Sequence, residues 1–345
     1  MPPPEGMAAM TPRAALRLLH NEIVQVAGCT EPAAIAYAFR TLIRHLPHPP
    51  GPDSLLARLH ISRDAFRNAS TAVVPHLKKP GILAAAAAGC ASRAADFNVF
   101  ADFDLPLARR FMKNGDWLRV VPVRRNGLVV ALSFNADTQI LLKGRHDHIE
   151  RLVVDGRDLT PRPRPLPPPP RLEDMFALAR RRDPELEALA LDFITRQVPS
   201  GKGYALEDQV ARRVAGRMAG YAHPVMTITG SGNQGIFLGL PYRHLYRQRG
   251  RDILPAVVFS LLAQVHLSHK HDRLSSECGL ATKAAPALAA GLAFAGGASP
   301  ADIRRLFRDI PARIGPLPCE GAEPACGGKS RRALRAVWPF FAAPA

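Results

Sequence analysis

The sequence predicts an α+β fold with a mainly helical core, built from N- and C-terminal segments with a small α+β module between them. Two observations carry this prediction. Apolar residues recur with helical spacing over much of 13–100 and 171–340. Between these parts, residues 117–154 alternate apolar and polar side chains in short runs, with a turn sequence at Asn126-Gly127. The two helical parts are therefore expected to share one core.

Five segments are expected along the chain. A proline-rich leader, expected to be disordered, precedes the first helical part. After the module, a polyproline tract is expected to act as a stiff spacer. In chain order the segments are the leader 1–12, the first helical part 13–100, the α+β module 101–160, the polyproline linker 161–170 and the second helical part 171–345, which holds the candidate cluster site.

Each helical part divides into elements at glycine, proline and polar positions. In the first part, Gly28 is expected to end one helix and Thr30 to cap the next. The expected helices are 13–26, 33–46, 82–95, 105–114, 172–182, 184–197, 206–218, 253–271, 281–294, 300–310 and 330–338, and the expected strands are 55–61, 117–124, 128–134, 139–143 and 149–154.

Composition and charge argue against several classes of protein. A hydrophobic content of 47% in 345 residues is typical of a soluble globular protein. The net charge of +17 would suit nucleic acid, but the arginines are scattered and aromatic residues make up only 6%, so nucleic acid is not the expected partner. No signal peptide is evident, and no uninterrupted apolar stretch reaches the roughly 18 residues of a membrane span. We expect a cytoplasmic protein with no membrane partner, compatible with a homo-oligomer.

The five cysteines are the first candidate site. Their number is odd and small for the chain length, so a reducing compartment is expected rather than a disulfide framework. Cys319 and Cys326 lie in a run rich in glycine and proline, where both thiols can point at one centre. With Cys29 and Cys278, they suggest an iron–sulfur cluster, although spacing alone favours ordinary buried or surface cysteines. Cys90, in an alanine-rich helix, is interpreted as a packed core residue.

A glycine-rich turn at 230–235 is the second candidate site. Glycines permit positive φ and let successive backbone N–H groups surround an anion such as an amino-acid carboxylate. Taken alone, the turn supports structural and functional interpretations equally. Two histidine pairs are interpreted as solvated or packed rather than metal-binding, because neither has further ligands at a suitable spacing: His146 with His148, and His266 with His269.

Four separated motifs occur in a fixed order. They are Gly28-Cys29-Thr30-Glu31-Pro32, Gly230-Ser231-Gly232-Asn233-Gln234-Gly235, Arg273-Leu274-Ser275 with Cys278-Gly279, and Cys319-Glu320-Gly321-Ala322 with Cys326. This ordered set resembles the L-cysteine desulfidase family, which is related to the iron–sulfur-dependent L-serine dehydratases. The resemblance covers residues 16–329, nearly the whole chain.

The resemblance implies a lyase that eliminates the β-substituent of a small amino acid. For L-cysteine the products are sulfide, ammonia and pyruvate, and no pyridoxal phosphate is needed. The resemblance also implies a 4Fe–4S cluster with one iron left for substrate. The implied ligands are Cys29, Cys278 and Cys319, with Cys326 as a further candidate, and the implied substrate-binding residues are Ser231, Asn233 and Gln234.

Two departures from the family pattern keep other functions open. Lysines and a histidine replace small residues at 75–81, and Lys283 stands in the segment 282–285. His76 and Lys283 are the candidates for a catalytic base. If these cationic side chains face the pocket, a substrate larger or more acidic than cysteine is expected. The alternatives are L-serine as substrate, a larger β-substituted amino acid, or a non-catalytic protein that binds a cluster or zinc.

Overall fold

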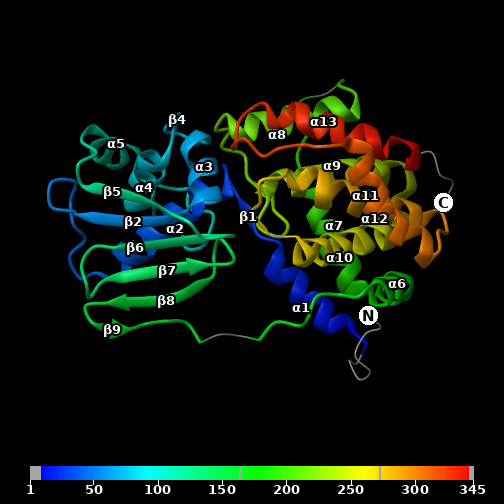
Figure 1. Ribbon diagram of the computed structural model, residues 1–345, viewed down its shortest axis with the longest axis horizontal. Helices are drawn as coiled ribbons and strands as arrows, with labels where there is room; N and C mark the ends of the chain where they lie inside the picture. Colours follow the sequence, from blue (N-terminus) through cyan, green and yellow to red (C-terminus); the bar gives the residue numbers. More distant parts are fainter. Residues whose placement is uncertain (1–8, 163–164, 200, 202, 272, 342–345) are drawn as a thin grey trace.

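The computed structural model describes residues 9–162, 165–199, 201, 203–271 and 273–341. Figure 1 shows two lobes side by side, one with a sheet and one built from helices. The α+β fold class is therefore confirmed. Most of the predicted leader lies outside the described residues, and helix α1 (Pro12–Glu22) begins one residue after its cap, Thr11.

The sheet lobe packs helices against a mixed six-stranded sheet. The strand order is β5-β2-β6-β7-β8-β9. Its strands are β2 (Ala57–Ser62), β5 (Leu118–Val123), β6 (Val129–Ser133), β7 (Gln139–Lys143), β8 (Ile149–Val154) and β9 (Arg157–Asp158). Its helices are α2 (Thr30–His45), α3 (Arg63–Thr71), α4 (Ile82–Cys90) and α5 (Leu105–Lys113), and β3 (Val73–Val74) pairs with β4 (Lys79–Pro80).

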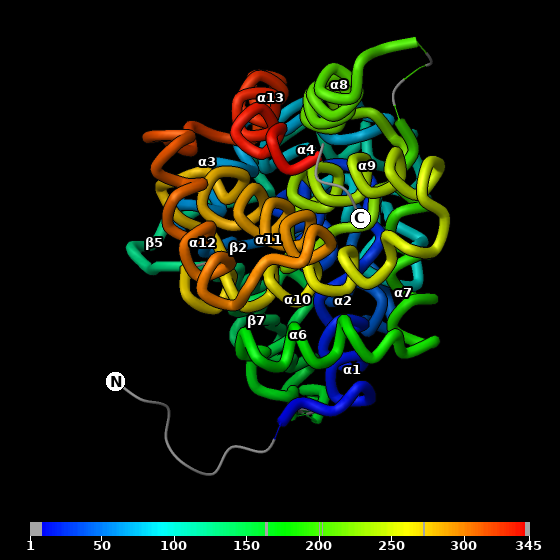
Figure 2. Tube along the Cα trace, turned by 90° about the vertical axis from the view of Figure 1, so that its right-hand side faces the viewer, coloured from blue at the N-terminus to red at the C-terminus, as the bar shows by residue number. Residues whose placement is uncertain are grey.

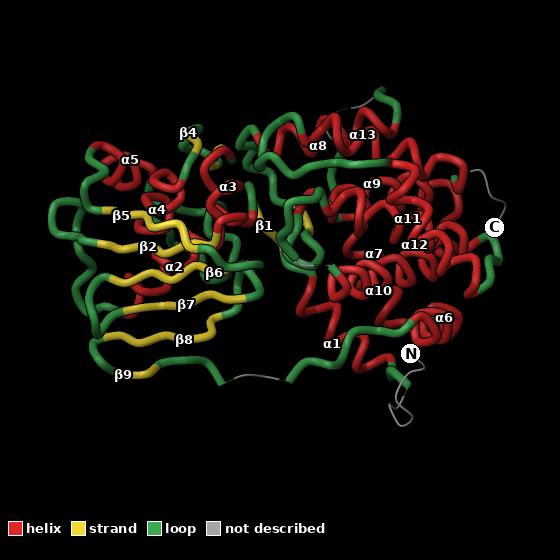
Figure 3. The backbone as a smooth tube through the Cα atoms, viewed as in Figure 1, coloured by secondary structure: helices red, strands yellow, loops and turns green. Residues whose placement is uncertain are grey.

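The helical lobe contains the rest of the described chain (Figure 3). Its helices after α1 are α6 (Leu172–Arg181), α7 (Pro184–Thr195), α8 (Leu206–Met218), α9 (Gly232–Arg249), η1 (Gly250–Ile253), α10 (Leu254–Lys270), the π-helix η2 (Leu280–Ala284), α11 (Ala285–Ala295), α12 (Pro300–Ile314), α13 (Cys326–Val337) and η3 (Trp338–Phe340). Helices α8 and α13 lie against each other at one end of this lobe (Figure 2).

The two apolar cores do not follow the predicted division at residue 100. One core is formed by residues between Val26 and Val154, whereas the other joins α1, Cys29 and Ala72 to the chain from Leu172 onward. The difference arises from β2, a strand that was predicted within the first helical part, 13–100. This strand lies between β5, to which it runs parallel, and β6, so the first helical part packs with the module. The Asn126-Gly127 turn thus connects two strands that are not neighbours.

A short two-stranded pairing connects the lobes. Strand β1 (Gln25–Val26) follows α1 and runs antiparallel to β10 (Val225–Met226), which comes directly before the glycine-rich turn. Figure 1 shows β1 at the junction of the lobes. The pairing therefore brings the segment that carries Cys29 next to the segment that leads into residues 230–235.

Helix α9 was missed by the sequence analysis, because it begins in the glycine-rich turn and contains Pro241. With η1 and α10 it forms a helical run, Gly232–Lys270, that is long and apolar enough to cross a membrane by length and composition. Within that run, 78% of the most apolar window is buried inside the molecule. The run therefore lies mostly in the interior of the helical lobe.

Candidate functional site

A cavity of about 90 Å³ lies where the two lobes meet. Such a volume accommodates several water molecules or one small ligand. It brings together every candidate ligand and substrate-binding residue from the sequence, namely Cys29, Cys278, Cys319, Cys326, Ser231, Asn233 and Gln234. The wall also contains polar residues that the sequence did not single out, among them Glu31, Asn68 and Arg217, and it includes Arg273.

Cys29 stands at the N-terminus of α2, as the sequence predicted, but it is the cap residue itself rather than Thr30. The preceding Gly28 has φ +68°, and a Cβ there would lie 2.8 Å from the ring of Pro75, so the turn requires glycine. Burial raises the pKa of the Cys29 thiol well above its ordinary value, and the neighbouring Glu31 carboxylate raises it further. Burial and Glu31 thus oppose the effect that a helix N-terminus has on a thiol pKa.

Cys278 and Cys319 are held together by the backbone, although 41 positions separate them. Cys278 N–H donates to the Leu317 carbonyl at 2.8 Å, and Cys319 N–H donates to the Ser276 carbonyl at 2.8 Å. These bonds flank an isolated antiparallel bridge between Glu277 and Pro318, and both cysteines line the cavity. Burial raises the pKa of Cys278 to about 11.

The thiols of four cysteines meet at this cavity. All five cysteines are free, and four of them line the cavity, from three segments of the chain. Within the described ranges, no three His, Cys, Asp or Glu side chains are grouped closely enough to hold one metal ion. A structural zinc site needs four ligands within about 2.0–2.3 Å of one point. Thiolates are ligands of iron–sulfur clusters as well as of zinc, so the type of donor present here is compatible with a cluster.

The glycine-rich turn leads into the N-terminus of α9 and also lines the cavity. Ser231 caps this helix, because its Oγ accepts from the Gln234 N–H at 3.4 Å. The Asn233 side-chain oxygen accepts from Arg217 Nη1 at 3.0 Å. The Gln234 side-chain oxygen accepts from the fully buried Gln264. Both amides therefore have their oxygen atoms occupied by neighbours of fixed position.

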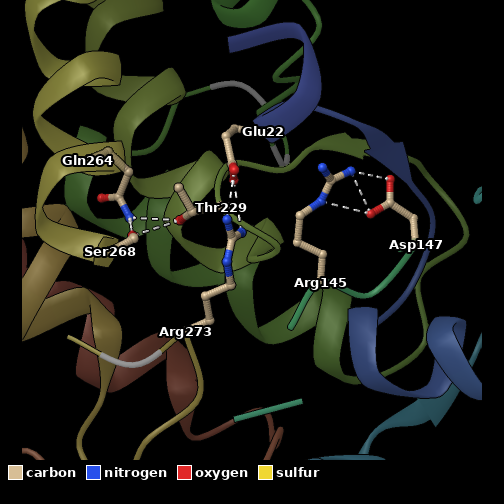
Figure 4. A network of polar contacts seen from close by, with 7 residues as sticks. All are labelled: Glu22, Arg145, Asp147, Thr229, Gln264, Ser268 and Arg273. Atoms are coloured by element: carbon tan, nitrogen blue, oxygen red, sulfur yellow. Dashed lines mark hydrogen bonds and ion pairs between the residues drawn. The ribbon is translucent and has the colours of Figure 1, made fainter. Parts of the chain in front are cut away.

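A network of polar contacts holds Thr229, the residue that precedes this turn (Figure 4). Thr229, with φ +50°, accepts from Gln264 at 3.1 Å and from Ser268 at 3.0 Å, so α10 fixes the residue that leads into the turn. Beside it, Arg273 makes a two-pronged ion pair with Glu22, at 2.8 and 2.6 Å. This pair connects the end of α1 to the segment that leads to Cys278.

Glu31 is the most densely bonded acid of the cavity wall. Its carboxylate accepts from Cys29, Thr30 and Asn68 at 2.9–3.1 Å, and it lies 3.7 Å from His146 Nε2. Burial alone would raise the pKa of Glu31, but His146 and these hydrogen bonds hold it well below its ordinary value. The interpretation of His146 as solvated was wrong: it is 4% exposed and reaches Glu31 from the loop between β7 and β8. No spacing in the sequence indicated this contact.

Neither His148 nor His266 lines the cavity. His148 is exposed and lies 3.4 Å from Glu150. His266 packs against Phe307, and its Nδ1 lies 2.8 Å from the Pro170 carbonyl oxygen.

Neither candidate for a catalytic base lines this cavity. His76 lies with Lys78 and Arg213 in a separate surface hollow of about 660 Å³. Lys283 is 2% exposed, and its Nζ donates to the Arg273 carbonyl at 3.2 Å. Lys79 is exposed in β4. His76 thus lies in a hollow apart from the residues that the motifs bring together, whereas Lys283 contacts the motif residues Arg273 and Gly279 without lining the cavity.

Comparison with known proteins gives consistent matches. Residues 193–337 match the family described as serine dehydratase alpha chain. Over most of its length, the chain is also similar to UPF0597 proteins: 24% identical to one from Thermosipho africanus, over 91% of this chain and 84% of the relative. It is 26% identical to one from Desulfitobacterium hafniense, over 93% and 84% of the two chains. No solved structure matches. The matched segment contains three of the four cavity cysteines, whereas Cys29 comes from outside it.

Proposed function

Because residues 193–337 match the family described as serine dehydratase alpha chain and nearly the whole chain is similar to UPF0597 proteins, we propose that the protein is an iron–sulfur-dependent β-elimination lyase for a small amino acid. L-Cysteine is the proposed substrate. The observation that carries the proposal is the single cavity that four cysteines share with a polar turn. The reaction consumes L-cysteine and water and releases pyruvate, ammonia and hydrogen sulfide, which balances all atoms.

The proposed cofactor is a 4Fe–4S cluster held by Cys29, Cys278 and Cys319, with Cys326 close enough to line the same cavity. When bound, such a cluster supplies a Lewis acid that polarises the leaving β-thiol or β-hydroxyl. The free thiols of the chain fit a reducing cytoplasm, where we place the protein.

The chain itself supplies binding and orientation. The N-terminus of α9, an 18-residue helix, ends at the cavity, and its first N–H groups and positive dipole end favour an anion there. The substrate carboxylate is therefore assigned to the side of Ser231, Asn233 and Gln234, and the β-substituent to the side of the thiols. Both lobes close around the cavity, so its wall limits the substrate to a small amino acid.

L-Serine is the second candidate substrate, because the matched family is described by that activity. A larger acidic substrate has less support, since His76, Lys78 and Lys283 all lie outside the cavity wall. A substrate panel distinguishes these candidates: L-cysteine, L-serine and β-substituted amino acids with an extra carboxylate. Preference for the acidic compounds, lost in Lys283→Ala, would restore the altered-pocket hypothesis.

The test of the proposal is anaerobic purification followed by iron and acid-labile sulfide analysis, visible absorption and a sulfide assay. We expect a brown protein that releases sulfide from L-cysteine. Cys29→Ser, Cys278→Ser and Cys319→Ser should each lose the cluster. Cys90→Ala is the control, because Cys90 is buried like Cys29 but lies in α4 and does not line the cavity. A colourless zinc protein, or three serine variants with full iron content, would refute the assignment.

A further inference from the structure

Arg217 is a buried cation in the cavity wall that no motif identified. It lies on α8 and is 3% exposed. Its Nη1 donates to the Asn233 side-chain oxygen at 3.0 Å. Its Nε and Nη2 are buried and have no hydrogen-bond partner in the part of the chain that the structure describes. Two of its three nitrogens are thus left unsatisfied at a cavity.

This arrangement is costly unless a ligand completes it. A buried charge is stable only when it is paired, and an unsatisfied buried donor destabilises a fold. The Glu31 carboxylate is in electrostatic contact with Arg217, but its oxygens already accept from Cys29, Thr30 and Asn68. Consistent with incomplete pairing, burial lowers the pKa of Arg217.

The two unpartnered nitrogens form one edge of the guanidinium. Nε and Nη2 carry parallel N–H bonds, and this pair matches the two oxygens of a carboxylate. The glycine-rich turn leaves room for the guanidinium of Arg217. A Cβ on residue 232 would lie 2.5 Å from the guanidinium carbon, so only glycine lets the turn pass this close.

We propose that Arg217 is the receptor for the α-carboxylate of the amino-acid substrate, which it binds through Nε and Nη2. Asn233 is then a positioning residue rather than a direct ligand, because its side-chain oxygen holds Nη1 and turns the free edge toward the cavity. This inference rests on the proposed function for the identity of the substrate. It rests on the geometry alone for the binding of a carboxylate.

The variants are Arg217→Gln and Arg217→Lys, with Arg213→Gln as matched control. Arg213 lies one turn earlier on the same helix and is 4% exposed, but its Nη2 donates to the backbone carbonyls of His223 and Pro224. It does not line the cavity. Circular dichroism and iron content show whether each variant folds and keeps its cluster.

The decisive measurement is equilibrium binding of L-alanine and L-alaninamide by calorimetry, under anaerobic conditions. L-Alanine carries the carboxylate but no leaving group, so no turnover is needed. Wild type and Arg213→Gln should prefer L-alanine, and Arg217→Gln should bind it about 10- to 100-fold more weakly while binding L-alaninamide unchanged. Arg217→Lys keeps the charge without the paired N–H edge, so it should recover part of the lost affinity for L-alanine. It also provides a test if Arg217→Gln fails to fold.

Three outcomes overturn the inference: equal binding of both ligands by wild type, an unchanged preference in the folded Arg217 variants, or loss of iron from those variants. The last would mean that Arg217 balances the charge of the cluster. If alanine binding depends on Arg217 but no amino acid is turned over, the proposed lyase activity fails while this inference stands. If L-cysteine is turned over equally by wild type and Arg217→Gln, the inference fails while the proposed function stands.

Discussion

Breaking the ion pair between Glu22 and Arg273 should destabilise the fold strongly. The Glu22 side chain is 2% exposed and that of Arg273 is 18% exposed, and two N–O contacts of 2.6 and 2.8 Å connect them. Arg273→Ala leaves a buried carboxylate without its cation, a change that costs about 3–5 kcal/mol. The exposed pair of Arg304 and Glu173, at 3.0 Å, is the matched control and should contribute about 0–1 kcal/mol.

The assay is urea unfolding of the reduced, metal-free protein, followed by circular dichroism. A double-mutant cycle with Glu22→Gln and Arg273→Ala isolates the pair, and the coupling energy is expected at the upper end of the usual range of about 0.5–3 kcal/mol. Salt should weaken the control pair but not this one, because burial limits screening. The reasoning fails if Arg273→Ala costs no more than Arg304→Ala, or if the two single changes are additive.

Three further predictions concern the site and its supporting helices. Asn233→Ala should raise KM for L-cysteine about tenfold with unchanged iron content. Asn233→Asp should raise KM more, because its carboxylate would pair with Arg217 in place of the substrate carboxylate. The same KM in the two variants would refute this. Gly89→Ala should cost about 1–3 kcal/mol, since its Cβ would lie 2.4 Å from the Ala36 carbonyl oxygen, whereas Gly328→Ala meets nothing within 4 Å and should not destabilise; similar unfolding midpoints would contradict the packing. Tyr242→Phe should lower the free energy of unfolding by about 1–3 kcal/mol, because it removes the hydrogen-bonded hydroxyl of a fully buried side chain. An unchanged free energy of unfolding would refute this prediction.

The sequence by itself determined the elements with strong local patterns. The helices on either side of Cys29 and the strands from residue 118 to residue 154 lie close to their expected positions, because periodicity and turn residues act over a few neighbours. The motif residues were also recognisable in the sequence, and the structure brings them to one cavity. Local patterns failed at α9, where glycines and Pro241 suggested a break that the tertiary packing overrides.

Only the tertiary structure decided which segments share a core and which polar groups face each other. Strand β2 lies between β5 and β6, and this pairing involves strands distant in the sequence. Residues 24–100 therefore belong mostly to the sheet lobe, and not to a core shared with the second helical part as predicted. The contacts of Arg217 with Asn233 and of Glu31 with His146 connect residues 16 and 115 positions apart, and no local spacing encodes them. Residue types that carry chemistry are visible in a sequence, but the burial and missing partners that give a group such as Arg217 a role arise only when the lobes close around it.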